Sequence, residues 1–214
     1  MSLSIEPALS SKYPGLDIEI VIVEGIKVSR ENPELEKFKV EIAKKVKEKW
    51  TLEQLKEHSV FRAYRDFFWR IGLDPTKNRP ASEALIRRIL RGNQLPKINT
   101  VVDAYNLASI ESTISIAAFD RERLKGKLVM RQACDGEIFL GIGMNAPTRL
   151  KGGEIVISDD EKLIAIYPYR DAESSKITED TRSLILLICG VPNIDKKHLL
   201  SARKIATEYI LKFS

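Results

Sequence analysis

The chain has 214 residues, of which 43% are hydrophobic and 30% are charged, and its formal net charge is +5 at pH 7. This composition is typical of one large globular domain, and no apolar run approaches the ~20 residues of a membrane-spanning helix. The scarcity of cysteine and histidine, without CxxC or HExxH, argues against a metal site, and the motifs of serine hydrolases, P-loop enzymes and dinucleotide enzymes are missing. The first residues do not resemble a secretory signal, so we expect a cytoplasmic protein, not bound to a membrane.

The N-terminal quarter of the chain predicts strands followed by helices. Residues 18–28, IEIVIVEGIKV, are β-branched and apolar and predict one or two strands. Apolar residues recur at spacings of three and four over 33–50, which predicts an amphipathic helix. The TLEQ segment then predicts a capping box, in which Thr51 caps the next helix and Gln54 reaches back. A further helix runs through VFRAYRDFFWR to Gly72, and its aromatic spacing favours core packing over base stacking.

Pro80 suits the first turn of a third long helix, PASEALIRRILRG, which we expect to end at Gly92. Glu83 and Arg87 are four residues apart in the order that favours an ion pair. The mild positive charge permits an RNA partner without requiring one. Two basic stretches carry candidate contacts to RNA phosphates. The alternative is that these residues form an ordinary solvated surface. They are Arg87, Arg88, Arg91, Arg121, Arg123 and Lys125.

The stretch KINTVVDAYNLASI places three polar residues on one line of a helix, because Asn99, Asp103 and Asn106 are four and three residues apart. In a structural role, Asn99 caps the helix, Asp103 accepts hydrogen bonds from nearby backbone or from Arg131, and Asn106 bonds a strand. In a functional role, the three side chains line a ligand pocket. We favour the structural role, because an unpaired buried polar group costs about 1–3 kcal/mol.

After residue 110, apolar residues recur at every second position instead of every third or fourth. Short runs such as TISIAAF, KLVMRQA, EIVIS and SLILLIC are separated by turn residues and predict a block of strands. The final segment, DKKHLLSARKIATEYILKF, predicts a closing helix. The fold class is therefore α+β, with N-terminal helices, then a mostly antiparallel or mixed sheet, then a C-terminal helix. We divide the chain into a strand–helix segment, 1–59, packed on a main body, 60–214.

Three segments resemble the editing domain of the phenylalanyl-tRNA synthetase beta subunit, called the B3/B4 domain. They are NTVVDAYNLASIESTISIAAFD, RLKGKLVMRQACDGEIFLGIG and GGEIVISDDEKLIAIYPYRDAESSKIT, and the resemblance covers about 60–190. It implies a free-standing domain that binds the aminoacyl end of tRNA, or a related aminoacyl ester, and hydrolyses mischarged aminoacyl-tRNA. It also implies no aminoacylation by this chain alone, because the catalytic core of the synthetase is absent, and no cofactor.

One position departs from the family pattern, because the family's HAFD histidine falls on Ala117. A methyl group cannot position water or substrate. The resemblance puts Glu173 near the family's pocket glutamate, as a catalytic base or an anchor for the substrate ammonium. The remaining pocket candidates are Asn106, Arg170, Asp171 and Thr178, each of which also has a structural interpretation. Because of Ala117, the alternative to a hydrolase is an inactive module that binds RNA or a small amino-acid-like ligand.

Overall fold

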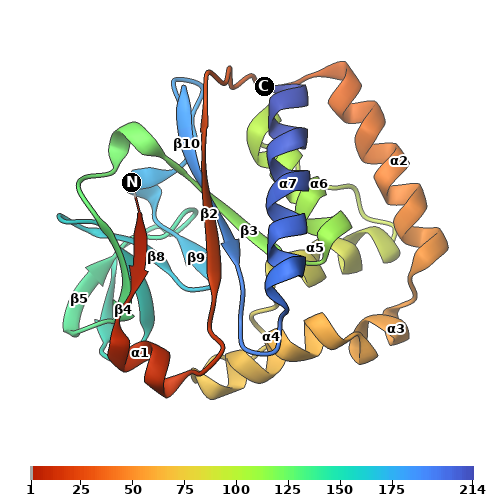
Figure 1. Cartoon of the computed structure of the whole chain (residues 1–214). Coiled ribbons are helices and arrows are strands. Elements are labelled where there is room, and N and C mark those ends of the chain that lie inside the picture. Colours follow the sequence, from red (N-terminus) through yellow and green to blue (C-terminus); the bar gives the residue numbers. More distant parts are fainter. Residues whose placement is uncertain (1) are drawn as a thin grey trace.

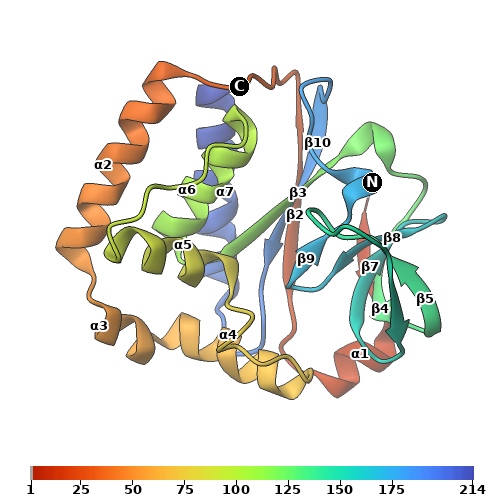
Figure 2. The same ribbon diagram turned by 180° about the vertical axis from the view of Figure 1, so that it is seen from behind.

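The structure, a computed structural model, describes residues 2–214. A three-stranded sheet stands in the middle, with a helical layer on one side and a β-rich layer on the other (Figures 1 and 2). The helices are α1 (Pro7–Lys12), α2 (Pro33–Lys49), α3 (Leu52–Glu57), α4 (Ser59–Arg70), α5 (Ala81–Leu90), α6 (Thr100–Ser112) and α7 (Lys196–Phe213). The strands are β1 (Leu3–Ile5), β2 (Ile18–Glu24), β3 (Ser115–Asp120), β4 (Leu128–Gln132), β5 (Asp135–Phe139), β6 (Thr148–Lys151), β7 (Ile155–Ser158), β8 (Leu163–Ile166), β9 (Arg170–Asp171) and β10 (Ser183–Cys189). Two short 3-10 helices follow β3 and β9, namely η1 (Arg121–Arg123) and η2 (Glu173–Ser175).

The central sheet has the order β2-β10-β3, and β10 is antiparallel to both neighbours. The sequence of β10, SLILLIC, is almost wholly apolar, and all but its first residue are buried. A strand that is buried on both faces needs such a continuous apolar run. Helices α6 and α7 cover one face, and the β-rich layer lies against the other (Figure 1).

The β-rich layer holds a five-stranded sheet in the order β1-β4-β7-β8-β9 and a separate β5–β6 hairpin. Only β1 runs parallel to its neighbour, β4, and the other pairs are antiparallel. The short strand β9 forms one edge and lies beside the central sheet (Figures 1 and 2). This arrangement confirms the predicted α+β class with mixed sheets and a closing C-terminal helix. Within residues 2–214, no helix combines the length and apolar character needed to cross a membrane.

Most local helix signals are confirmed. The capping box of Thr51 and Gln54 is present, and Arg87 Nε lies 2.7 Å from Glu83 Oε1. The aromatic cluster of α4 is buried at four of its positions, as its spacing predicted. Trp69 is the exception, because its side chain is 58% exposed, so the prediction of core packing was wrong for that residue.

The first residues of the chain form elements that the sequence did not predict. Strand β1 has three residues and finds its partner β4 far along the chain, so no local pattern marks it. Strand β2, by contrast, lies within the predicted strand region 18–28 and pairs with β10 over seven residues. The segment 1–59 therefore contributes one strand to the central sheet and one to the five-stranded sheet, and its division from 60–214 stays a prediction.

Candidate functional site

A cavity of about 90 Å³, here called the Asp171 cavity, lies between the central sheet and the β8–β9 hairpin. On β3, Ser115 and Ala117 share one face, and they pair with Cys189 and Leu187 of β10. The hairpin closes the other side with β9. The cavity is lined by Ala81, Ser115, Ile116, Ala117, Ala165, Ile166, Tyr167, Pro168, Tyr169, Arg170, Asp171, Leu187 and Cys189. Three of the predicted pocket residues, Ala117, Arg170 and Asp171, therefore meet in one place.

Asp171 supplies the single carboxylate among the lining residues. Its backbone is fixed by pairing with Ala165 and by the Ile142 N–H, which donates to the Asp171 carbonyl at 2.9 Å. Its carboxylate has no hydrogen-bond or ion-pair partner within residues 2–214. Burial raises the pKa of Asp171 to about 7, because desolvation disfavours the charged form. The cavity thus holds a carboxyl group that gains from any cation brought against it.

The groups around Asp171 stay neutral. Burial, and then the nearby Asp171 carboxylate, raise the pKa of the Cys189 thiol well above its usual value. A protonated thiol is a poor nucleophile, so Cys189 does not supply covalent chemistry here. Burial, and then the charge of Asp171, also raise the pKa of the Tyr105 phenol. The Asp171 cavity is therefore suited to binding a cation rather than to thiol chemistry.

The neighbouring arginine does not neutralise Asp171. The Arg170 guanidinium donates to the Ile142 carbonyl at 3.2 Å and to the Tyr169 hydroxyl at 3.3 Å. It also lies over the Tyr169 ring, 5.1 Å from the ring centroid. Arg170 also lines the cavity, but within residues 2–214 no ion pair joins its guanidinium to the Asp171 carboxylate.

The other predicted pocket residues lie elsewhere. Glu173 forms an ion pair with Lys176 and lines a separate hollow of about 520 Å³ beside Leu140. Asn106 is half-buried on α6, and its side chain makes no hydrogen bond within residues 2–214. The Thr178 N–H donates to the Thr181 hydroxyl at 3.0 Å. None of the three lines the Asp171 cavity, so the catalytic role of Glu173 stays a prediction.

Two residues of the polar line on α6 hold the fold together. Asn99 caps the helix, since its side-chain oxygen accepts from the Val102 N–H at 2.9 Å. Asp103 accepts from the Ile98 N–H at 3.1 Å and pairs with Lys39 of α2. Arg131 is not part of this network, contrary to our expectation. It lies on β4 in the other layer, where its guanidinium pairs with Glu137 at 2.7 Å.

Tyrosine hydroxyls support the cavity wall, and sequence reasoning missed them. The Tyr64 hydroxyl of α4 accepts from the Ser115 N–H at 3.0 Å and donates to the Cys189 carbonyl. The Tyr167 hydroxyl donates to the Gly190 carbonyl. These partners are distant in sequence, so the helical spacing of Tyr64 indicated burial but not its polar role.

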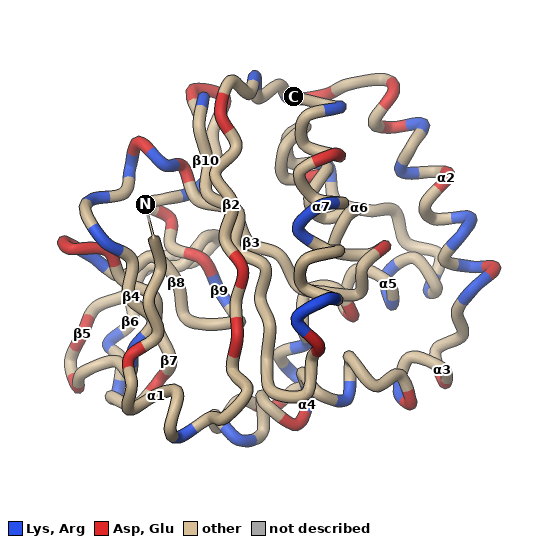
Figure 3. Tube along the Cα trace, in the orientation of Figure 1, with Lys and Arg blue, Asp and Glu red and all other residues tan. Residues whose placement is uncertain are grey.

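The six candidate RNA-contact residues form two sets rather than one patch. One set lies on or just after α5 and the other lies in or just after η1, on opposite sides of the central sheet (Figure 1). Arg87 is tied to Glu83, Arg121 pairs with Glu24, and Arg123 lies 3.5 Å from Asp120. Basic and acidic residues also alternate along α2 (Figure 3). Of the six, Arg88, Arg91 and Lys125 are exposed and make no ion pair within residues 2–214.

Comparison with known proteins identifies the family of this chain. Residues 63–214, more than half of the chain, match the model of the B3/4 domain. The phenylalanine–tRNA ligase beta subunit of Thermotoga maritima is 33% identical over 117 residues, which cover 54% of this chain and 15% of that subunit. The beta subunit of Protochlamydia amoebophila is 34% identical over 107 residues, covering 50% and 13%. The chain thus spans a small part of the length of these relatives.

One solved structure has the same fold over nearly the whole chain. It is an N-terminal fragment of the phenylalanyl-tRNA synthetase beta subunit from Pyrococcus horikoshii, with a TM-score of 0.52 and 12% sequence identity. The alignment covers 99% of this chain and 48% of that one. At this identity the likeness supports the fold alone, whereas the family match rests on sequence. The chain belongs to the B3/4 domain family.

Proposed function

We propose that this protein binds the aminoacyl end of a tRNA, or a related aminoacyl ester, with the α-ammonium of the aminoacyl group against Asp171. The observation that carries the proposal is the carboxylate of Asp171, which lines the cavity without a partner. Asp171 is half-buried, and a carboxylate drawn partly out of water without a counter-ion costs free energy that a ligand cation would recover. The ammonium distinguishes an aminoacyl ester from the uncharged end of the same tRNA.

The size of the Asp171 cavity selects among aminoacyl groups. Its volume of about 90 Å³ equals roughly three water molecules at liquid density and lies far below the ~300 Å³ of the smallest drug-sized pockets. An ammonium with a glycyl, alanyl or seryl group fits this space, and a phenyl ring does not. The small side chain of Ala117 keeps this space open, whereas a histidine side chain at the same position would fill much of it.

Ester hydrolysis is the second candidate function, and the raised pKa of Asp171 favours it. A carboxylate with a pKa of about 7 is matched to accept a proton from water near neutral pH. The two roles make opposite demands, because an ammonium against Asp171 holds it ionised and lowers its pKa, which weakens it as a base. If Asp171 anchors the ammonium, deacylation is slow and proceeds through a differently placed water.

The binding experiment uses tRNA that carries alanine through a non-hydrolysable amide at its 3′ end. Fluorescence anisotropy compares it with uncharged tRNA and with the N-acetylated form, which has no ammonium. We expect the wild-type protein to prefer the free-amine form by about tenfold, or ~1.4 kcal/mol. Asp171→Asn should abolish the preference, and the matched variant Glu173→Gln should keep it. Equal binding of all three tRNAs by the wild-type protein would refute the proposal.

Hydrolysis is measured separately, as release of amino acid from pre-charged alanyl-, tyrosyl- and phenylalanyl-tRNA against a no-protein control. Loss of activity in Asp171→Asn, with a rate that rises with pH through about 7, supports Asp171 as the base. Loss of hydrolysis in Glu173→Gln, with hydrolysis retained in Asp171→Asn, supports the role that the family resemblance gives to Glu173. Binding without any release supports the inactive binding module.

A further inference from the structure

The Asp171 cavity also contains a buried hydroxyl, that of Ser115 at the start of β3. Ser115 is 3% exposed, and Ser82, in the first turn of α5, is 0% exposed. Their hydroxyl oxygens lie 3.4 Å apart, and the Ser82 N–H lies 3.5 Å from the Ser115 oxygen. Ordinary hydrogen bonds are shorter, at about 2.5–3.0 Å between hydroxyls and about 2.7–3.2 Å from an N–H to an oxygen. The Ser115 hydroxyl is therefore buried beside the cavity with weak partners.

The two hydroxyls carry two protons but share a single contact, so one proton has no acceptor within residues 2–214. If Ser115 donated to Ser82, the leftover proton would belong to Ser82, which is fully buried and does not line the cavity. An unpaired donor in that place costs about 1–3 kcal/mol. If Ser82 donates to Ser115, the leftover proton belongs to Ser115 and faces the cavity. The second arrangement is favoured, and it makes Ser115 a hydrogen-bond donor to a ligand.

An aminoacyl ester offers such a donor two kinds of oxygen, the ester carbonyl and, in some amino acids, a side-chain hydroxyl. The ester is joined to the ribose of the tRNA, which is too large for a cavity of about 90 Å³ and keeps the carbonyl near the opening. The side chain of the amino acid is the part that enters. In a seryl group the hydroxyl and the ammonium are on adjacent carbons, so both fit in the space between Ser115 and Asp171.

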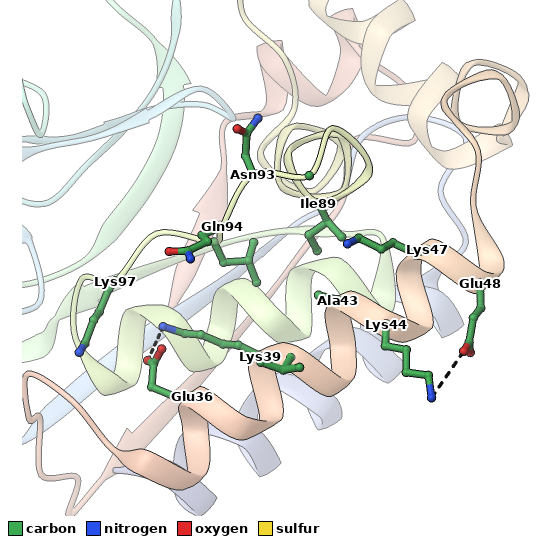
Figure 4. A pocket seen from close by; sticks show the side chains of 13 residues that line it. Glu36, Lys39, Ala43, Lys44, Lys47, Glu48, Ile89, Asn93, Gln94 and Lys97 are labelled. Atoms are coloured by element: carbon green, nitrogen blue, oxygen red, sulfur yellow. Dashed lines mark hydrogen bonds and ion pairs between the residues drawn. The ribbon is translucent and has the colours of Figure 1, made fainter.

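A larger hollow, of about 700 Å³, lies beside α2 and lacks these features (Figure 4). Its two carboxylates already face lysines, with Glu36 at 2.7 Å from Lys39 and Glu48 at 4.0 Å from Lys44. Among residues 2–214, no serine, threonine or tyrosine lines it. The combination of an unpaired carboxylate with a buried hydroxyl therefore belongs to the Asp171 cavity and not to this hollow.

We propose that the Asp171 cavity selects the seryl group among small aminoacyl groups, because the Ser115 hydroxyl donates its proton to the hydroxyl of the ligand. The inference rests on the proposed function, since the ammonium at Asp171 brings the side chain to Ser115. A site built to bond a hydroxyl rejects the analogue that lacks it, because its own polar group is then left unpaired. Ser82 is a positioning residue, since its hydroxyl directs the Ser115 proton toward the ligand and the two bonds strengthen one another.

The probes are tRNAs that carry a seryl, alanyl or 2-aminobutyryl group through the non-hydrolysable amide. The 2-aminobutyryl group has the size of the seryl group, with a methyl group in place of the hydroxyl. Fluorescence anisotropy should show that the wild-type protein binds the seryl form at least about tenfold more tightly than the 2-aminobutyryl form. Ser115→Ala should reduce this ratio to less than about threefold. Its preference for the free-amine alanyl form over the N-acetylated form, with circular dichroism, shows that the variant is folded and its cavity intact.

Ser82→Ala should lower the ratio only part of the way, because the Ser115 hydroxyl remains but loses the partner that directs its proton. The matched control is Ser174→Ala, which changes an exposed serine outside the cavity and should keep the wild-type ratio.

The inference fails if the wild-type protein binds the seryl and 2-aminobutyryl forms equally, or if Ser115→Ala keeps the wild-type ratio. Either result leaves the proposed function intact as long as the free-amine alanyl form is preferred over its N-acetylated form. Equal losses of seryl and alanyl affinity in Ser115→Ala would assign its proton to the ester carbonyl and would also overturn the inference. If the free amine is preferred with none of the aminoacyl groups, the proposed function itself is refuted.

Discussion

Lys39 of α2 and Asp103 of α6 form an ion pair with 2.7 Å between Nζ and Oδ2, and their side chains are only 9% and 2% exposed. The pair joins the outermost helix to the helix that covers the central sheet. Asp103 also accepts the Ile98 N–H, so its carboxylate fixes the chain that enters α6. The acidic member of the polar line on α6 thus acts inside the fold.

We predict that Asp103→Ala destabilises the protein by about 3 kcal/mol, the lower end of the cost of breaking a buried ion pair. The remaining contact of Lys39 with Glu36 keeps the loss from being larger. For a chain of this size, the melting temperature should fall by about 6–12 °C in a thermal scan. Asn106→Ala, on the same helix, removes no hydrogen bond and should leave the melting temperature nearly unchanged. An unchanged melting temperature in Asp103→Ala would overturn this account.

The size of the Asp171 cavity gives a second prediction. Ala117→Leu should fill the space beside Leu187 and Cys189 and so abolish the preference for alanyl over uncharged tRNA. In the wild-type protein, glycyl, alanyl and seryl forms should bind at least about tenfold more tightly than phenylalanyl and tyrosyl forms. Anisotropy with the amide-linked tRNAs measures both effects. With the alanyl form, Ser115→Ala, which removes an oxygen from the same wall without adding volume, is the control. Tight binding of the phenylalanyl form would contradict the size argument.

Asp171 should make stability depend on pH. Its pKa in the folded protein is about 7, above the ~3.9 of an unfolded chain. Between these values the folded protein binds more protons than the unfolded chain, so its stability falls as pH rises from about 4 to about 7 and is level above. The loss is about 2–4 kcal/mol. Asp171→Asn should remove this dependence and be more stable than the wild-type protein at pH 8, but similar at pH 4. Urea unfolding at both pH values tests it, and an identical pH profile for the two proteins would speak against it.

A fourth prediction concerns tRNA contacts. The α5 set is the better placed of the two basic sets, because Ala81 at the start of α5 lines the Asp171 cavity. We expect Arg88→Glu with Arg91→Glu to weaken tRNA binding and to lower the salt slope by about 2, since each phosphate contact releases about one counterion. The matched pair, Arg123→Glu with Lys125→Glu, should have little effect. Filter binding between 50 and 200 mM salt measures the slopes. A larger effect of Arg123→Glu with Lys125→Glu than of Arg88→Glu with Arg91→Glu would indicate that tRNA binds on the other side of the central sheet.

The helices followed from the sequence because their signals are local. The predicted caps at Thr51 and Asn99 each use a partner three residues away, and the structure contains both. Long-range pairing has no such signal. Lys39 looked like any other lysine of an amphipathic helix, and its partner Asp103 is 64 residues away.

The sequence predicted only part of the candidate site, because the site also depends on long-range pairing. Ala117 and Asp171 come from different sheets and meet only through the β10 register and the fold of β9 against the central sheet. Sequence reasoning named both but grouped them with Glu173, which is two residues beyond Asp171. The 3-10 turn η2 carries Glu173 to the neighbouring hollow, and a loop alignment does not contain that change of direction.

The hydroxyl of Tyr64 joins the Ser115 N–H of β3 to the Cys189 carbonyl of β10. Both of these residues line the Asp171 cavity, whereas Tyr64 belongs to α4 and lies behind the wall. The spacing of the two strands at this point is therefore set from outside the cavity. If the cavity binds the proposed aminoacyl group, substitutions in α4 would change its affinity without changing any residue that touches it.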